Sequence, residues 1–232
     1  MYFCHSGEIW NDHPTLVPGV LAADHITADV VVRPQVAKLV AAAESRLAAH
    51  SEGDLPEIQA WRRAFSRMGL KPTQYRCASE ALLRRFKKER SLPEIHPLID
   101  LCNATSMAFA IPVAVFDVAN IADYLEVRYA DGSEQYESFS GETEHPAPHE
   151  VIFADGAGLA HARRWTNRQS RRSAVREETT AVLIVAEALH ASAHEDVQRL
   201  VSALADELDT VWPASSRTAL LSSSAPRFEF EG

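Results

Sequence analysis

The residue types with the most evident chemistry lie close together in residues 161–176, which contain six arginines and one tryptophan but no acidic residue. Guanidinium groups bind phosphate through paired hydrogen bonds, tryptophan stacks on nucleobases, and amide side chains hydrogen-bond to the polar edges of bases. Asn167 and Gln169 place two such amides among the arginines. This combination indicates a site for a polyanionic ligand.

A second basic block lies at residues 61–90, where ten lysines and arginines are accompanied by only two acids, Glu80 and Glu89. Together the two blocks hold 16 of the 23 basic residues and carry a net charge of +14 in a chain of net charge −9, so the remainder carries −23. This asymmetry predicts a positive surface on an acidic body. Because proteins that coat nucleic acid nonspecifically are usually basic overall, the acidity favours a local contact with RNA.

The composition is that of an ordinary globular protein, with 46% hydrophobic and 24% charged residues in a chain of 232, enough for one sizeable domain or two small ones. The three cysteines, Cys4, Cys77 and Cys102, are widely spaced and form no CxxC pair. We therefore expect neither disulfides nor a thiolate metal site, and the cytoplasm is the natural compartment. Neither a signal peptide nor a membrane span is expected, because no suitable apolar run occurs.

The secondary-structure signals change character near Pro112. Before it, short extended segments are expected over residues 2–32, with a turn at 17–20. Four helices are then expected, over residues 34–47, 56–69, 79–88 and 95–110, and Ser79 is the expected N-cap of the third. After it, strands are expected over 113–116, 125–129, 135–139, 151–154 and 159–163. Residues 181–191 fit a strand or a helix, and 195–211 an amphipathic helix. Helices followed by antiparallel strands imply an α+β fold, with a single domain over 1–212 and a loosely ordered tail over 213–232.

Five segments together resemble the B3/B4 domain, the editing module of the β subunit of phenylalanyl-tRNA synthetase. They are residues 61–69, 79–85, 98–103, 111–117 and 150–155. The resemblance covers about residues 10–212 without another synthetase domain, so the chain is similar to a free-standing B3/B4 protein. It implies helices packed on a mostly antiparallel sheet, and hydrolysis of the ester of a wrongly charged tRNA. Free-standing relatives include a deacylase for arginine tRNA carrying canavanine, which this chain also resembles.

The resemblance implies a site around Cys102 and Asn103, where the family has a threonine-asparagine pair at the end of a helix. The Asn103 amide would hold the amino acid's ammonium or carbonyl; alternatively, it bonds its own helix backbone. Pro112 matches the family's pocket-wall proline. Ala114 stands where the bacterial enzymes have a histidine, so that general base is missing. The family's tyrosine-recognising glutamate falls near residues 167–169, where no acid exists, so the chain is not expected to edit tyrosine in the same way.

Hydrolysis remains feasible without these two groups. An aminoacyl ester on ribose is already activated, and orienting a water while stabilising the oxyanion can suffice. The side chains expected to act in catalysis are Asn103, Arg163, Arg164 and Asn167. Those expected to bind the substrate are Cys102, Pro112, Asp117, Asp155, Trp165, Arg168 and Ser170. The alternative for the arginine-rich segment is a solvated basic strand and loop.

Some of these residues could have a structural role instead of a role in binding. Trp165 either stacks on the terminal adenine or fills the core. A guanidinium-like substrate would need a carboxylate partner, and each possible partner could equally be a capping or turn residue. These carboxylates are Asp100, Asp117, Glu150 and Asp155. The cations expected to bind tRNA phosphates are Arg84, Arg85, Lys87, Lys88, Arg171 and Arg172, although a basic helix face is often merely solvated.

Metal and cofactor chemistry is not expected. His190 and His194 are four residues apart but lack the glutamate of an HExxH motif and a third ligand, and neither a Walker loop nor GxGxxG is present. The resemblance implies a metal-independent, cofactor-free hydrolase of the cytoplasm that removes a wrong amino acid from the acceptor end of mischarged tRNA, above all canavanyl-tRNA(Arg), and so supports translation fidelity. Neither DNA nor a membrane is an expected partner.

Two other functions remain open. One is a module that binds tRNA or an amino acid without hydrolysing it, and the other is a small-molecule amidohydrolase or esterase that has lost tRNA. The basic blocks favour the tRNA-dependent functions, because a small-molecule enzyme has no need for a local charge of +14.

Overall fold

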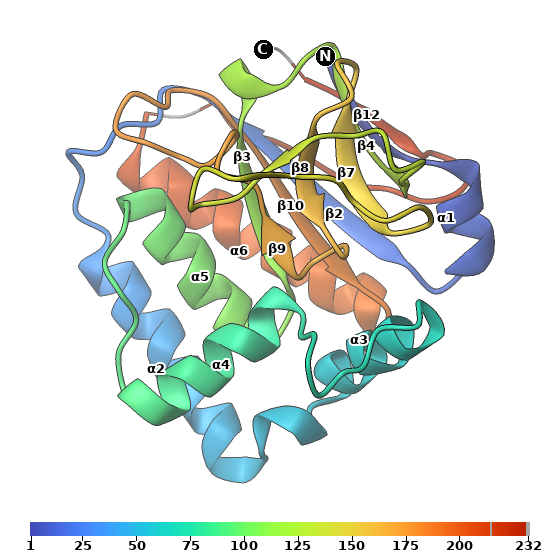
Figure 1. Cartoon of the computed structure of the whole chain (residues 1–232). Coiled ribbons are helices and arrows are strands. Elements are labelled where there is room, and N and C mark those ends of the chain that lie inside the picture. The colour runs from blue at the N-terminus through green and yellow to red at the C-terminus, as the bar shows by residue number, and fades with distance from the viewer. Residues whose placement is uncertain (214, 231–232) are drawn as a thin grey trace.

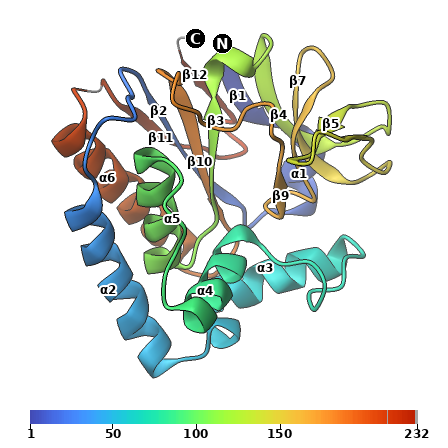
Figure 2. The ribbon, with the colours of Figure 1, turned by 60° about the vertical axis from the view of Figure 1, so that its left-hand side comes forward.

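The computed structural model describes residues 1–213 and 215–230, and in it two sheets stack on each other, with helices against the outer face of one sheet and at one end of the molecule (Figures 1 and 2). The four-stranded sheet has the order β11-β2-β10-β3 and the six-stranded sheet the order β12-β1-β4-β7-β8-β9. Alternate residues of the four-stranded sheet enter different cores. Leu21 and Ile184 pack with residues of α2, α5 and α6, whereas Val20 and Val185 pack with Phe153 of the six-stranded sheet. The expected α+β fold is confirmed.

Five helices occupy the ranges in which helices were expected. They are α2 (Arg33–Ala49), α3 (Pro56–Arg67), α4 (Ala78–Glu89), α5 (Pro97–Phe109) and α6 (Ala193–Val211). The N-cap of α4 is Cys77 rather than Ser79, which is buried in the first turn. A short helix, α1 (Gly7–Asp12), was not expected; Ser6 caps it by accepting a hydrogen bond from Ile9 N. None of the helices in the described residues is long and apolar enough to cross a membrane.

Five strands after Pro112 fall close to the five expected ranges: β3 (Val113–Asp117), β4 (Tyr124–Tyr129), β5 (Tyr136–Glu137), β7 (Val151–Asp155) and β8 (Ala160–Arg163). The two-residue strands β6 (Thr143–Glu144) and β9 (Arg168–Gln169) were not expected, and β10 (Val182–Ala188) follows them. The segment that fitted a strand or a helix is therefore the strand β10. All seven of its residues are buried, because it lies inside one sheet and between two layers. Most neighbouring strands are antiparallel; β1 (Tyr2–His5) and β4 are a parallel pair.

The turn expected at residues 17–20 is wrong, because those residues begin the strand β2 (Val17–Ala23). Gly19 is needed there for packing rather than for turning. A Cβ added to it would lie 2.5 Å from Val197 Cγ1 and 2.6 Å from Val201 Cγ2 of α6. The glycine lets α6 approach the sheet closely.

The segment after Pro213 also differs from the expectation of a loosely ordered tail. It supplies β11 (Arg217–Leu220), which pairs with β2, and β12 (Arg227–Glu229), which pairs with β1. Each of these strands covers the edge of a sheet, so their backbone groups gain ladder hydrogen bonds. The tail was also expected to include residues 214, 231 and 232, which lie outside the described residues.

Candidate functional site

A small cavity is lined by residues of β3, β10 and the connection from β8 to β9. Figure 1 shows where these strands lie in the two sheets. The volume of the cavity is about 60 Å³, which suits a small polar head group. Four residues singled out from the sequence line it, namely Pro112, Trp165, Asn167 and Arg168. The other lining residues are Ala78, Val113, Ala114, Phe153, Ala162, Thr166, Gln169, Val185 and Glu187.

The wall between β8 and β9 has a strained backbone. Arg164 and Trp165 both adopt positive φ angles, 47° and 57°, which side-chain-bearing residues avoid. Three interactions hold this conformation in place. Glu150 Oε1 accepts the Arg164 backbone N–H at 3.0 Å, Val151 O accepts that of Trp165 at 2.7 Å, and the Trp165 indole is anchored to Glu187. Strain that is held by several surrounding contacts is frequent at ligand sites.

Glu187 is a buried carboxylate in the lining of the cavity and was not singled out from the sequence. The Trp165 indole N–H donates to both of its carboxylate oxygens at 3.0 Å, and His5 Nε2 lies 2.7 Å from Oε1. The Trp61 indole donates to its backbone carbonyl at 3.2 Å. Among the described residues no lysine or arginine forms an ion pair with Glu187. A buried carboxylate with so few partners can still accept hydrogen bonds from a ligand.

Arg163 and Arg168 form an ion-pair network at the edge of the site. Arg163 is buried and donates to both Glu150 oxygens at 2.9 Å, and its third nitrogen binds Glu144. Arg168 binds the same Glu144 carboxylate at 3.2 and 3.3 Å, and both guanidiniums lie against the ring of Tyr136. Burial opposes the shift, but the Arg163 hydrogen bonds hold the pKa of Glu150 below its usual value. Arg163 therefore serves the architecture, whereas Arg168 also reaches the cavity.

The other polar residues of this segment have separate partners. The Asn167 amide nitrogen donates to Arg76 O at 2.7 Å, while its amide oxygen makes no hydrogen bond with a described residue. The Arg164 guanidinium lies 4.9 Å from the centre of the Tyr75 ring. Ser170 is buried and donates to Glu137 O at 2.9 Å. Of these three residues, Asn167 lines the cavity, and its amide oxygen has no hydrogen-bond partner among the described residues.

A family model for the B3/4 domain matches residues 60–203, a range that includes all the lining residues of the cavity. The chain belongs to the B3/4 domain family. No curated protein matches it. Among solved structures, the chain is similar to an N-terminal fragment of the phenylalanyl-tRNA synthetase β subunit from Pyrococcus horikoshii, with 10% identity and a TM-score of 0.48. The match covers 93% of this chain but 50% of that one, so the chain spans half the length of the fragment.

Asn103 and Cys102 of this B3/4 protein do not line the cavity beside Glu187. Successive helical residues point about 100° apart, so the two side chains leave α5 in different directions. Asn103 lines a separate groove of 680 Å³ between α2, the α4–α5 connection and α5, together with Asp100. Cys102 is buried among apolar side chains, and burial raises the pKa of its thiol far above the usual value. It is a neutral core residue.

The carboxylates considered as partners for a guanidinium are engaged elsewhere. Asp117 Oδ1 accepts the backbone N–H of Ala119 at 3.1 Å, and its Oδ2 accepts the Thr179 hydroxyl at 2.9 Å. Asp155 accepts three backbone N–H groups of neighbouring loops at 2.9 to 3.1 Å. Asp100 accepts the N–H of Ile95 at 2.9 Å. These hydrogen bonds are those of capping and turn residues, and Asp100 also lines the groove with Asn103. Trp165 is fully buried and fills the core, as the alternative interpretation held.

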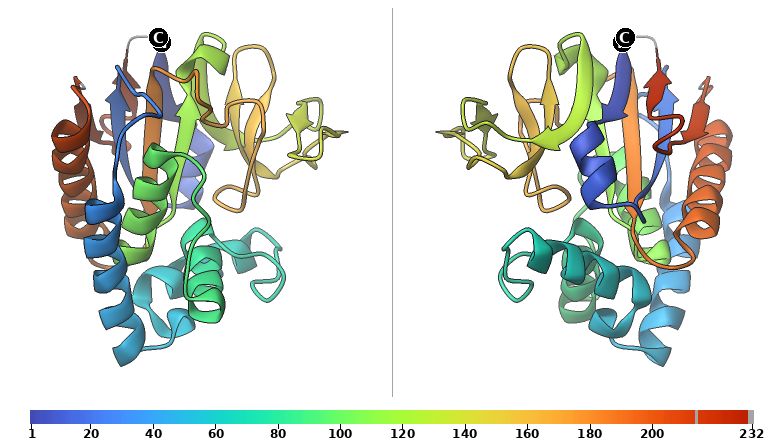
Figure 3. Two further views of the ribbon diagram at one scale, coloured as in Figure 1. Left: turned by 90° about the vertical axis from the view of Figure 1, so that its left-hand side faces the viewer. Right: turned by 90° about the vertical axis from the view of Figure 1, so that its right-hand side faces the viewer.

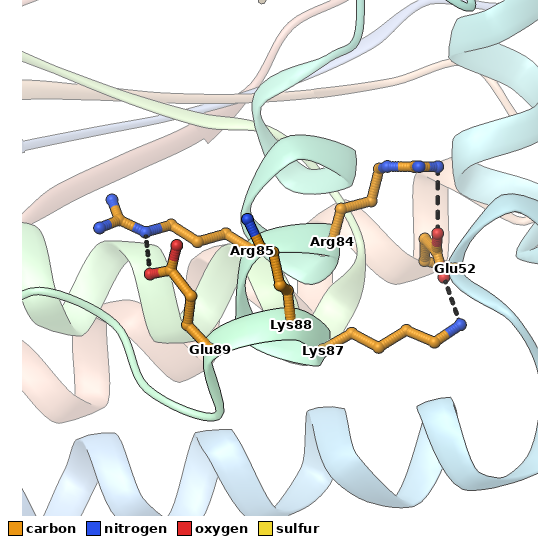
Figure 4. Close-up of a pocket in the computed structure, with 6 residues that line it drawn as sticks. All are labelled: Glu52, Arg84, Arg85, Lys87, Lys88 and Glu89. Atoms are coloured by element: carbon orange, nitrogen blue, oxygen red, sulfur yellow. Dashed lines mark hydrogen bonds and ion pairs between the residues drawn. The ribbon is translucent and has the colours of Figure 1, made fainter.

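The basic row of α4 consists of Arg84, Arg85, Lys87 and Lys88. Nearby carboxylates partly neutralise its charge (Figure 4). Glu52 accepts hydrogen bonds from Arg84 at 3.2 Å and from Lys87 at 3.1 Å, and Arg85 pairs with Glu89 at 2.8 Å. Lys88 has no ion pair within the described residues. Arg171 lies 3.6 Å from Glu137, and Arg172 is exposed. The net positive charge of this surface is therefore smaller than the number of basic residues in the sequence indicated.

Proposed function

We propose that this B3/4 protein is a trans-acting hydrolase that removes a wrong amino acid from the acceptor end of tRNA in the cytoplasm. The amino acid would enter the cavity beside Glu187. The observation that carries the proposal is the juxtaposition of Pro112, Asn167 and Arg168 with a buried carboxylate inside the family-matched region. Membership of a family related to tRNA-synthetase editing domains supports the reaction class.

The reaction needs a water molecule and donors rather than a nucleophilic side chain. Water adds to the ester carbonyl, the ribose oxygen leaves with the proton that the water loses, and the free amino acid and tRNA result. The Asn167 oxygen is available to accept a hydrogen bond from the α-ammonium group, and Arg168 to stabilise the oxyanion. With Ala114 in the lining, no side-chain base is assigned, and the neighbouring ribose hydroxyl takes part instead.

The substrate that the cavity favours has a cationic, hydrogen-bonding side chain. Glu187 is the acidic residue in the lining, and a carboxylate accepts paired hydrogen bonds from a guanidinium. The small volume suits such a head group better than an aromatic ring. Glu187 accounts for an amino acid with a guanidinium-like group. The choice of canavanyl-tRNA(Arg) as the proposed substrate, with arginyl-tRNA as the cognate ester that must be spared, rests on the resemblance to a canavanyl-tRNA deacylase.

The test is ester loss from a panel of charged tRNAs. Arginine tRNA carrying canavanine should lose its amino acid fastest, ahead of arginine tRNA carrying arginine and phenylalanine tRNA carrying tyrosine. Asn167→Ala should slow the reaction, whereas Asn103→Ala should not if the amino acid occupies the cavity beside Glu187. The reverse order would move the site to the groove that Asn103 lines. Stable esters in every case would refute the hydrolase.

A non-catalytic module that binds tRNA or an amino acid is the second candidate function. It is favoured by the ion pairs that occupy Arg163 and Arg168, and by the alanine at residue 114. The same panel separates the two functions, because a binding module would retain charged tRNA and leave its ester intact.

A further inference from the structure

An aromatic ring is exposed at the tip of a small hairpin. Phe139 is 67% exposed and follows β5, and the hairpin of β5 and β6 projects from the body of the molecule (Figures 2 and 3). Two backbone hydrogen bonds lie within the tip, from Ser138 N to Glu142 O and from Gly141 N to Ser138 O, each 2.9 Å. A single exposed apolar side chain is common, so only its surroundings can indicate whether it binds a ligand.

The hairpin is joined to the arginine-rich segment that follows β9. The Ser170 hydroxyl and the Arg171 N–H both donate to Glu137 O, at 2.9 and 3.0 Å. The Arg172 N–H in turn donates to the Ser170 hydroxyl at 3.2 Å. These bonds place the backbone of Arg171 and Arg172 beside the strand that leads to Phe139, and both side chains are exposed. The Arg171 guanidinium lies 3.6 Å from Glu137 of that strand. A ring and two cations therefore share one ridge.

The ridge is continuous with the cavity of the proposed active site. Arg168 and Gln169 of β9 line the cavity, and Ser170 follows directly. The Tyr136 hydroxyl of β5 donates to Gln169 O at 2.8 Å, which fixes the hairpin against β9. Arg171 lies only two residues beyond the lining, so at most about 7 Å of extended chain separates them. A linear ligand on the ridge could reach the cavity.

We propose that Phe139, Arg171 and Arg172 form a platform for the single-stranded 3′ end of tRNA. An unpaired base would stack on Phe139, and phosphates would contact the two guanidiniums. A duplex hides the faces of its bases, so an exposed aromatic ring selects unpaired RNA. Part of the charge of Arg171 is offset by Glu137, 3.6 Å away, and Glu142 is also nearby. Stacking is therefore the selective contact. The inference rests on the proposed function for the identity of the RNA.

The test is binding of a labelled single-stranded RNA that ends in CCA. Phe139→Leu, which keeps an apolar side chain but removes the aromatic face, should weaken binding about tenfold, whereas Phe139→Tyr should retain it. Arg172→Ala should weaken binding and lower the salt dependence, whereas Arg199→Ala on α6 should do neither. Binding of a duplex of equal length should be unaffected by Phe139→Leu. Equal affinities of the Leu and Tyr variants for the single strand would overturn the platform.

Ester hydrolysis at saturating protein separates this inference from the proposed function. Binding that depends on an aromatic ring at residue 139, without ester loss from any charged tRNA, would support the platform and refute the hydrolase. Ester loss together with single-strand binding that ignores Phe139→Leu would support the hydrolase and refute the platform.

Discussion

At the scale of single residues, the cavity depends on Glu187 and the groups that hold it. The carboxylate is satisfied by donors from two directions, the Trp165 indole from the β8–β9 connection and His5 from β1. The carboxylate is thereby oriented while some of its accepting capacity remains unused. Such pre-organisation lowers the cost of binding a cation in a buried place.

Glu187→Gln should therefore lower the selectivity for a guanidinium-bearing amino acid, while the protein still folds. Glutamine keeps the size of the side chain but loses the charge that pairs with a guanidinium. A hydrogen bond to a charged group contributes about 1.5–3 kcal/mol, so the preference for canavanyl-tRNA(Arg) over a tRNA charged with a neutral amino acid should fall about 10- to 100-fold. The ratio of the two kcat/KM values measures this, because a folding defect affects both. An unchanged ratio would exclude Glu187 as the counter-ion.

The sequence contained a signal for Glu187 that is clear only once the fold is known. It is the single acid in β10, an otherwise apolar strand that is buried along its whole length. Its partners His5, Trp61 and Trp165 are distant in sequence, so spacing could not connect them. Pro112, Asn167 and Arg168 could be selected from residue type and resemblance, and they do meet at the cavity. Which way Asn103 points depends on how α5 packs, which residue type alone does not determine.

At the scale of elements, close packing explains where the sequence pattern misled. Pro18 and Gly19 are typical turn residues, yet both lie in β2 between β10 and β11. Glycine here reflects the close approach of α6, and that requirement arises from a helix almost two hundred residues further along the chain. By contrast, the long amphipathic helices and the apolar strands after Pro112 could be predicted, because each has a strong local period.

Gly19→Ala should destabilise the protein by about 1–3 kcal/mol, because its Cβ would overlap two valine methyl groups of α6. The measurement is the urea midpoint of unfolding. Val197→Ala and Val201→Ala together remove the overlapping methyl groups, so adding Gly19→Ala to that background should cost much less than it does in the native chain. If Gly19→Ala destabilised the protein equally in both backgrounds, the glycine would be required for its backbone conformation and not for the close approach of α6.

The start of α6 contains a group that should weaken the fold in acid. Burial alone would raise the pKa of Asp196, but hydrogen bonds from Ser192 and His190 help to lower it to about 2. A carboxyl whose pKa is lowered by folding stabilises the folded state at pH values above its ordinary pKa of 3.8. That stabilisation is lost as the pH falls toward 2. Asp196→Asn should lower stability at neutral pH and flatten the loss between about pH 4 and pH 2.

Urea unfolding of this variant from pH 2 to pH 6 provides the measurement. The stability difference from the native protein should shrink steadily below about pH 4, since the native carboxyl then becomes protonated. Asp206→Asn on the exposed side of the same helix should follow the native curve. A difference that stays constant down to pH 2 would contradict the assigned hydrogen bonds.

At the scale of the whole molecule, the fold distributes its charges more evenly than the sequence suggests. Arg62, Arg76 and Arg84 all lie within 4 Å of the buried Glu80, and Glu52 binds Arg84 and Lys87. Charge counting could identify the basic blocks and Glu80 within one of them. It could not show that three arginines converge on Glu80 or that Glu52 reaches the block, because these contacts depend on tertiary structure. The segment after Pro213 shows the same limit, because its strands are specified by their partners in β2 and β1.

Glu52→Gln therefore tests whether the row on α4 binds tRNA. The substitution would free Arg84 and Lys87 from their shared carboxylate and remove one negative charge beside them (Figure 4). If the row contacts phosphates, tRNA should bind several-fold more tightly at low salt, and the dependence of log K on log salt should steepen by about 1 to 2. Glu195→Gln on α6 changes the net charge equally but lies away from the row, so it should leave both quantities unchanged. If the two variants bind tRNA alike, the row is a solvated helix face, and the acceptor end must be held by the segment after β9 alone.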